Sequence, residues 1–201
     1  MARVRVPGVL QRFSITYFVV ASTAAITAKY TDDSDNNNEL KGYKTKIKDL
    51  TTHWARWIVA FVFLIVHTLI IFLLNVPGCP TGYLGPAGLH DGAKYPPECV
   101  GGATGYIDRV FFTSDHIYGN PTPKSVYGSA PFDPEGLLGS FTSVVQVFLG
   151  YQGGQIILSY NKHESRLKRF VVWGVVNGVL GLILCQGRLN DGWIPINKNL
   201  W

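Results

Sequence analysis

The sequence predicts an all-α fold: a polytopic membrane helix bundle of about four transmembrane helices with one long loop outside the cytosol. Hydrophobic residues make up 47% of the 201 residues and charged residues only 15%, whereas about 25% is usual in soluble chains. Four stretches contain no Asp, Glu, Lys or Arg: 13–28, 57–76, 137–160 and 170–185. Basic residues gather in two short connections between these stretches, as they do on the cytosolic side of membrane proteins.

The first predicted span lies within residues 1–28, with the N-terminus outside the cytosol. Its uncharged part is shorter than the roughly 20 residues that cross a bilayer, so residues 6–13 must extend it. This places Gln11 and Arg12 at the membrane edge or in a cavity. An arginine there can reach the lipid headgroups, or it can hold a phosphate or carboxylate through its planar fork. Both interpretations of Arg12 stay open.

A polar loop over 29–56 connects to the second span at 57–76. A soluble amphipathic helix shows a charged face, and residues 57–76 have none. His67, in mid-span, is interpreted as a hydrogen-bonded structural residue. The 29–56 loop is placed in the cytosol because most of the basic residues of this half of the chain lie there.

Residues 77–136 form a Gly/Pro/aromatic loop that we expect to fold as an ordered cap over the bundle. We predict a short helix at 105–112 that turns Asp108 and Arg109 toward water. Cys79 and Cys99 lie in this loop, outside the cytosol, where a disulfide persists; their spacing allows a pairing without proving it.

The third span is predicted at 137–160 and the fourth at 170–187, joined by a cytosolic loop at 161–169. Before the third span, Asp133 is interpreted as an N-cap, with Pro134 in the first helical position and Glu135 at the positive end of the helix dipole. The two carboxylates also allow an acid/base interpretation. Residues 188–201 are expected to lead into further spans, and both chain ends look as if the protein continues beyond them.

The composition and motifs exclude several function classes. The net charge of +5 reflects basic residues beside spans, so we predict no nucleic-acid partner. Phosphate-binding Gly-Lys loops, HExxH, paired CxxC and Gly-x-Ser-x-Gly motifs are absent from the sequence, and no metal is predicted.

Five strings occur in one order: VRVPGVLQR at 4–12, VPGCPTGYLGPAG at 76–88, KYPPECVGGATGYIDR at 94–109, FDPEGLLGS at 132–140 and IPINKNLW at 194–201. Together they resemble the heparan-alpha-glucosaminide N-acetyltransferase family over essentially the whole chain. The resemblance implies a multi-pass protein of the lysosomal membrane, so that the 77–136 loop is luminal. It implies transfer of acetyl from cytosolic acetyl-CoA to the terminal glucosamine amine of heparan sulfate in the lumen.

The resemblance also implies what this chain lacks. The catalytic histidine of the family is expected in a span upstream of Met1, so the isolated chain is expected to be inactive. Arg5 matches a functionally sensitive arginine of the family. We predict that Arg5, Gln11 and Arg12 steady the phosphates of CoA, and that the luminal residues Asp133, Glu135 and Asn199 contact the aminosugar.

The expected partners are the lipid bilayer, the glucosamine end of heparan sulfate and, as an open expectation, a second copy of the chain. Two alternatives stay open: a transporter-like or channel-like membrane protein, and a structural fragment without activity. Solute flux without acetyl-CoA would favour the first of these.

Overall fold

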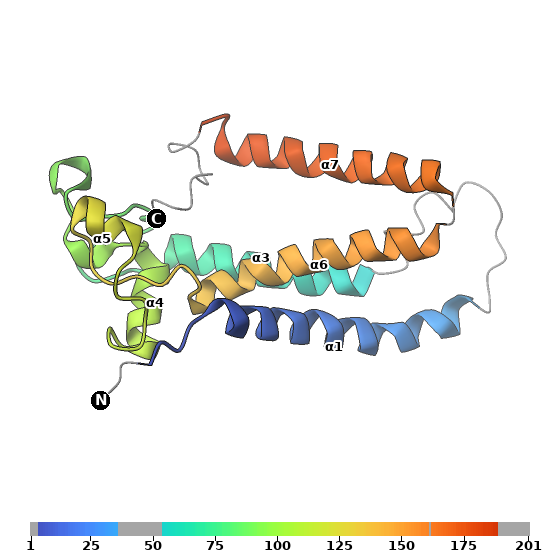
Figure 1. Ribbon diagram of the computed structural model, residues 1–201, viewed down its shortest axis with the longest axis horizontal. Coiled ribbons are helices and arrows are strands. Elements are labelled where there is room, and N and C mark those ends of the chain that lie inside the picture. Colours follow the sequence, from blue (N-terminus) through green and yellow to red (C-terminus); the bar gives the residue numbers. More distant parts are fainter. Residues whose placement is uncertain (1–3, 36–53, 161, 189–201) are drawn as a thin grey trace. The chain divides into compact units, whose positions relative to one another are not determined.

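The computed structural model describes residues 4–35, 54–160 and 162–188 (Figure 1). Most of the predicted 29–56 and 188–201 segments lies outside these residues. The chain divides into two compact units, 1–148 and 149–201, which are described separately below. Over the described residues the structure is helical, with a single isolated bridge between Gly88 and Tyr95 and no named strand. The predicted all-α class is confirmed.

The first unit contains α1 (Val9–Asp35), α3 (Trp54–Leu73) and the first part of α6 (Leu137–Ser159). α1 therefore continues into the predicted 29–56 loop, and α3 begins three residues before the predicted span. In the C-terminal half of α1, the buried Arg56 of α3 donates from Nε to Thr27 Oγ1 at 2.5 Å and from Nη2 to the carbonyl of Ala24. These bonds hold the start of α3 against α1.

Edge-to-face aromatic contacts join α6 to α3. Phe63 meets Phe141 with ring centroids 5.3 Å apart, and Trp57 meets Phe148 at 4.8 Å. Such pairs contribute about 0.5–1.5 kcal/mol beyond the area that they bury. They therefore fix α6 against α3 by side-chain shape in a bundle where polar surface is scarce.

Three helices of the described chain are long and apolar enough to cross a membrane: Val9–Thr27 within α1, all of α3, and α7 (His163–Cys185). α6 has 23 residues, which is a sufficient length, but it is not among these three. That α6 crosses the membrane as the third span stays a prediction.

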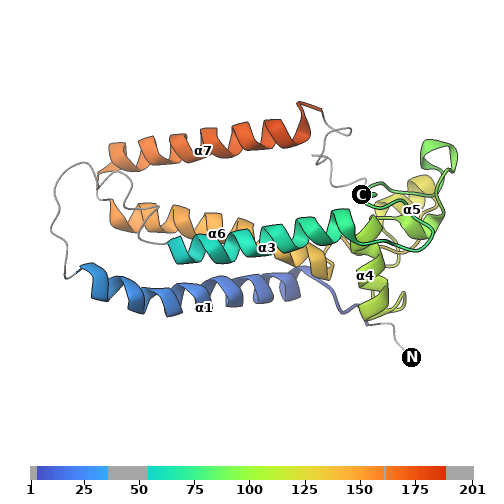
Figure 2. The same cartoon turned by 180° about the vertical axis from the view of Figure 1, so that it is seen from behind.

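The 77–136 segment folds as a cap. It contains the short helices η2 (His90–Gly92), η3 (Pro97–Cys99), α4 (Gly102–Phe112) and α5 (Thr122–Tyr127). Figures 1 and 2 show α4 lying across the direction of α1 and α3 at one end of the first unit. The predicted short helix at 105–112 is thus present, three residues longer at its start.

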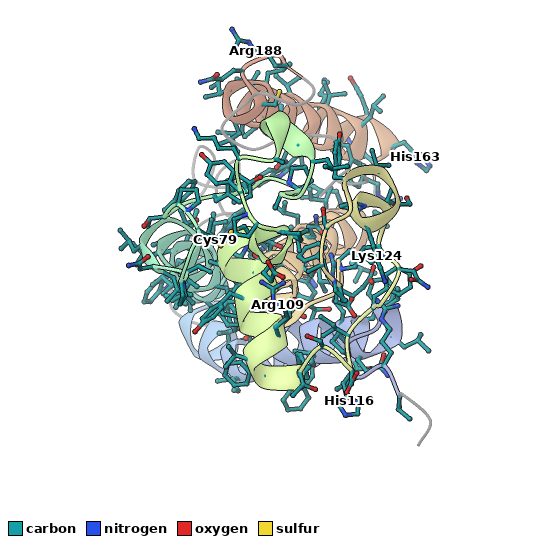
Figure 3. The ribbon with its side chains drawn as sticks, turned by 90° about the vertical axis from the view of Figure 1, so that its left-hand side faces the viewer. Cys79, Arg109, His116, Lys124, His163 and Arg188 are labelled. Atoms are coloured by element: carbon teal, nitrogen blue, oxygen red, sulfur yellow. A yellow bond between two sulfur atoms is a disulfide. The ribbon has the colours of Figure 1, made fainter. Side chains whose placement is uncertain are left out.

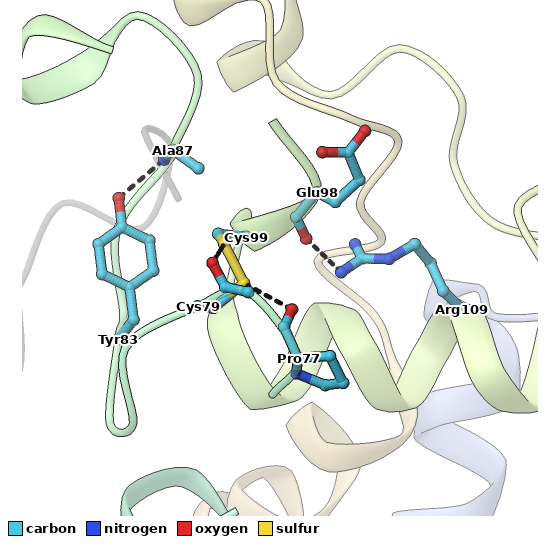
Figure 4. Close-up of a disulfide and its surroundings, with 8 residues drawn as sticks. Pro77, Cys79, Tyr83, Ala87, Glu98, Cys99 and Arg109 are labelled. Atoms are coloured by element: carbon cyan, nitrogen blue, oxygen red, sulfur yellow. Dashed lines mark hydrogen bonds between the residues drawn. A yellow bond between two sulfur atoms is a disulfide. The ribbon is translucent and has the colours of Figure 1, made fainter. Parts of the chain in front are cut away.

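A disulfide between Cys79 and Cys99 staples the cap (Figure 4). It lies in a small buried cluster of Ala87, Cys99, Val100 and Phe132. Beside it the hydroxyl of Tyr83 accepts the backbone N–H of Ala87 at 2.9 Å. The cap therefore has a core of its own that orients α4.

Glycine is required where α4 starts. Gly102 has φ +52°, and a Cβ at this position would lie 1.9 Å from the carbonyl oxygen of Tyr83. Any side chain would push the helix start away from the backbone of Tyr83, so Gly102 permits α4 to pack closely on the disulfide cluster.

The second unit consists of the rest of α6 and α7. α7 begins at His163, seven residues before the predicted 170–187 span, because the segment HESRLKR consists largely of good helix formers. An exposed ion pair between Glu164 and Lys168 supports this first part of the helix. Arg169 stacks over the ring of Tyr160, with 3.9 Å between its Cζ and the ring centroid, at the turn between the two helices.

Candidate functional site

Arg5 lies at the centre of a charged cluster at the cap end of the first unit. Its Nε donates to Asp133 Oδ2 at 2.9 Å, and its Nη2 donates to Asp133 Oδ1 at 2.6 Å and to Glu135 Oε2 at 2.5 Å. The guanidinium also lies 4.9 Å from the ring centroid of Tyr118. Hydrogen bonds to Asp133 are the main cause that raises the pKa of Arg5 above its ordinary value.

Asp133 is fully buried and well supplied with donors. Besides Arg5, it accepts the backbone N–H of Tyr118 and that of Glu135, each at 3.0 Å. The predicted N-cap role is wrong, because α6 begins only at Leu137. Asp133 instead closes a turn onto Glu135, a local bond that Asp makes readily outside helices.

His116 holds the segment that enters α1. Its carbonyl accepts the N–H of Val6 at 2.9 Å, and its Nδ1 lies 2.9 Å from the carbonyl oxygen of Val4. Figure 3 shows His116 on the cap, seen from its outer side. The 4–8 segment is thus fixed on the cap by backbone bonds as well as by the charged cluster, which agrees with a structural role for this histidine.

A cavity of about 200 Å³ opens where the cap meets α1 and α6. Its wall is largely apolar, and its polar groups come from Gln11, Arg12, Glu135 and Ser140. The lining residues belong to the 6–8 segment, α1, α4 and the start of α6: Val6, Pro7, Gly8, Gln11, Arg12, Ile15, Phe112, Glu135, Leu137 and Ser140. Residues more than a hundred positions apart thus line one space.

Arg12 borders this cavity and is also tied to α6, because its Nε donates to Ser143 Oγ. The sequence placed Gln11 and Arg12 at the membrane edge or in a cavity, and the structure has both residues lining the cavity. Arg5 is not among the lining residues, and its guanidinium is engaged by two carboxylates.

The structure corrects the prediction for Asp108. This residue does not turn toward water: it is fully buried on α4, and its Oδ1 accepts the backbone N–H of Leu137 at 2.9 Å. Asp108 therefore supplies the cap at the start of α6 that was assigned to Asp133. Burial raises the pKa of its carboxyl to about 6.

The neighbouring Arg109 is half-buried, and its Nη2 donates to the carbonyl of Glu98 (Figure 4). Burial lowers the pKa of Arg109. The prediction that Asp108 and Arg109 turn toward water is therefore wrong. α4 packs against η3 and the start of α6, and these segments cover both side chains.

The structure brings together residues that the sequence assigned to two different contacts. Arg5, predicted for the cofactor, pairs with Asp133 and Glu135, predicted for the substrate. Asn199 lies outside the described residues. Within the described ranges, no three His, Cys, Asp or Glu side chains gather closely enough to hold a metal ion.

Beyond Gln11 and Arg12, sequence reasoning missed the residues that line the cavity, and it missed the role of Asp108. The cavity has no signal in the local sequence, since it arises where separate segments meet. A signal for Asp108 did exist: apart from Arg109, its neighbours in GYIDRVFF are apolar, aromatic or small, and they lie on a short helix of a cap predicted to be ordered.

Comparison with known proteins supports the order of motifs found in the sequence. The chain is 42% identical over 201 residues to the heparan-alpha-glucosaminide N-acetyltransferases of Mus musculus and Homo sapiens. The match covers 99% of this chain. The predicted resemblance is confirmed.

This chain spans about 30% of the length of these N-acetyltransferases. No protein-family model matches it. Because the match covers 99% of this chain, the aligned region spans the 4–12 segment, the cap and the start of α6.

Proposed function

We propose that this chain is a segment of a transmembrane N-acetyltransferase that moves acetyl from acetyl-CoA to the terminal glucosamine amine of heparan sulfate. The observation that carries the proposal is the 42% identity along 99% of the chain to two proteins of that name. The remaining length of such a protein supplies the catalytic histidine expected upstream. The segment described here supplies part of the acceptor site.

The cavity suits the acceptor better than the donor. Pockets for drug-sized ligands measure about 300–1,000 Å³, whereas this cavity measures about 200 Å³. It therefore has room for about one sugar ring and not for a CoA molecule. The apolar wall fits the face of a sugar ring, and the few polar groups fix its orientation.

Glu135 is the group that would hold the amine. Glu135 is one of the residues that line the cavity, and its side chain is 21% exposed. Arg5 holds one carboxylate oxygen from outside the lining. A charged carboxylate oriented in this way can accept a hydrogen bond from the protonated amine of glucosamine.

The predicted orientation in the membrane supports an acceptor site at the cap. The basic residues of the 29–56 connection predict that it is cytosolic, and within the first unit the cap with its disulfide lies at the ends of α1 and α3 away from that connection. Glucosamine in the lumen reaches the cap end directly. The prediction that Arg5, Gln11 and Arg12 steady phosphates of cytosolic CoA stays a prediction, and it would require CoA to extend across the membrane.

The test uses a longer protein in which this chain is joined to the flanking segments that its relatives possess. Membranes containing it should transfer labelled acetyl from acetyl-CoA to glucosamine, and membranes containing only the 201-residue chain should not. Glu135→Gln should raise the KM for glucosamine about tenfold or more, with a smaller change in kcat, because binding of the amine loses its charged acceptor.

The matched control is Glu98→Gln, an exposed glutamate of η3 outside the cavity lining. This variant should keep the KM of the parent protein. An unchanged KM in Glu135→Gln would refute the role of Glu135, and absence of acetyl transfer by the longer protein would refute the proposed function itself.

A further inference from the structure

Asp108 joins two walls of the cavity. It lies on α4 one helical turn before Phe112, which lines the cavity from the cap side. Its Oδ1 accepts the N–H of Leu137, the first residue of α6 and another lining residue. One hydrogen bond from a buried side chain thus connects the helices that carry Phe112 and Leu137.

The other oxygen of Asp108 is buried without a hydrogen-bond partner among the described residues. It lies against the backbone of Gly136, where a Cβ would come within 1.8 Å of Oδ2. The Asp108 carboxyl is therefore packed tightly against the 133–137 turn, which also carries Glu135.

The charged groups around Asp108 come from several elements. Arg109 on α4 lowers its pKa and Asp133 before α6 raises it, while Arg5 and Glu135 lie beyond Asp133 in the charged cluster. η3 contributes Glu98, which acts on Arg109, and α3, which packs against α4, carries Arg56 and His67 as titratable groups. No cation among the described residues forms an ion pair with Asp108.

We propose that Asp108 is a positioning residue of the cavity, and that its protonation controls how firmly the first turn of α6 is held against α4. This deepens the proposed function, because it rests on the cavity in which that function places the acceptor sugar. It adds a pH-dependent control of the cavity wall by a residue outside the lining.

The effect of protonation follows from the different environments of the two carboxyl oxygens of Asp108. The ionised carboxylate accepts the Leu137 N–H as a charge-assisted hydrogen bond, which is about twice as strong as a neutral one. One proton taken from water binds at the unpartnered Oδ2 and removes this charge, while Oδ1 remains a neutral carbonyl acceptor. Protonation removes the cost of the buried charge, which stabilises the chain against global unfolding. The hydrogen bond from Leu137 lowers the pKa of Asp108, so protonation favours a local opening in which this bond breaks while Asp108 stays buried. Burial places the pKa of this group near 6, so the change occurs at mildly acidic pH.

The experiment measures amide hydrogen exchange in the peptide that covers residues 133–140, using the purified chain and correcting for the intrinsic pH dependence of exchange. In the wild type, corrected exchange should rise about fivefold between about pH 7 and about pH 5, as the charged bond becomes a neutral one. Asp108→Asn has a neutral acceptor at every pH, so its exchange should be fast at both values. The exposed aspartate in Asp115→Asn provides the matched control and should behave as the wild type.

Two results would overturn the proposal: no change with pH in the wild type, or the same pH response in Asp108→Asn as in the wild type. If Asp108→Asn does not fold, infrared spectra of the wild-type chain with labelled aspartate provide the second measurement. A carboxylic acid band that disappears near pH 6 is expected, and its absence would refute the proposal.

These outcomes are separate from those of the acetyl-transfer assay. A longer protein that fails to acetylate glucosamine would refute the proposed function and leave the exchange result intact. An Asp108→Asn chain that exchanges like the wild type would refute the positioning role and leave acetyl transfer intact.

Discussion

Arg5 and Asp133 are joined by two parallel hydrogen bonds, Nε to Oδ2 at 2.9 Å and Nη2 to Oδ1 at 2.6 Å, across a separation of 128 residues. Asp133 is fully buried, while the Arg5 side chain is 36% exposed. The pair fixes the chain segment before α1 on the turn before α6. The pair therefore helps to hold the 6–8 and 135–140 segments, which both line the cavity, next to each other.

Loss of Arg5 should destabilise the fold more than an ordinary surface mutation does. Arg5→Ala leaves Asp133 buried without its cation, and breaking a buried pair costs about 3–5 kcal/mol. Because Arg5 is partly exposed, we expect about 2 kcal/mol, measured by unfolding in detergent micelles. Arg5→Lys should recover only part of this, since lysine cannot form the two-pronged bond. The exposed Arg188 provides the control in Arg188→Ala, and an equal effect of both alanine variants would contradict this account.

Removal of the disulfide should loosen the cap. Cys79 and Cys99 enclose a segment with a sequence separation of 20, for which loop-closure entropy predicts about 3 kcal/mol of stabilisation. The double variant Cys79→Ser, Cys99→Ser should therefore unfold at a lower temperature than the parent. Alkylation of the denatured, unreduced parent should modify only Cys185, the free cysteine of the described chain; labelling at Cys79 or Cys99 would show that the pairing is absent.

Gly136 and Gly139 form a matched pair of positions at the start of α6. A Cβ at position 136 would lie 1.8 Å from Asp108 Oδ2, whereas one at 139 would lie 3.5 Å from the nearest atom, the carbonyl oxygen of Pro134. Gly136→Ala should therefore cost about 1–3 kcal/mol through overpacking, and Gly139→Ala should be neutral or slightly stabilising. Thermal unfolding of the two variants distinguishes them, and equal stability would argue against the close approach of Asp108.

The buried carboxyl of Asp108 should make stability depend on pH in a stated direction. Its pKa is raised from 3.8 to about 6 in the folded chain, so the folded state binds the proton more tightly than the unfolded state. The free energy of unfolding should consequently rise as pH falls from about 6 to about 4, by at most about 3 kcal/mol for a shift of this size. Above that window the cost of the buried charge is fully present.

Asp108→Asn should lack this part of the pH dependence. Chemical unfolding of the variant and the parent at several pH values provides the comparison. A difference between them that does not grow as pH rises through the window would show that Asp108 does not carry a raised pKa.

Much of the helical framework could be predicted from the sequence. The start of the third charge-free stretch coincides with the start of α6 at Leu137, and the helix in the cap was expected within three residues of its observed start. Charge-free apolar stretches identify such helices because a polar backbone in lipid must satisfy its own hydrogen bonds. The helix ends differ from the prediction: α7 begins earlier because HESRLKR contains good helix formers, whereas helix propensity gives no reason for α1 to continue through KYTDDSD to Asp35.

The site was predicted only in part. Arg5, Asp133 and Glu135 were identified as functional candidates, but their mutual pairing could not be seen, because it joins segments 128 residues apart. The environments of Asp108 and Asp133 were predicted wrongly for the same reason: both are fully buried, and the cap at the start of α6 comes from Asp108. Both are short acidic residues near helix ends, and only the packing of α4 against the start of α6 decides which of them is the cap.

The wide separation of Arg5 and Asp133 has a consequence for how the protein is made. Ribosomes add about 5–20 residues per second, so Asp133 leaves the synthesis site roughly 6–25 s after Arg5, given their separation of 128 residues. During that interval the apolar part of α1 is already available for insertion into the bilayer, while Arg5, in the segment before α1, has no carboxylate partner. The newly made chain must therefore keep Arg5 in water or among lipid headgroups, and the cap can close over α1 only as a late event of biogenesis.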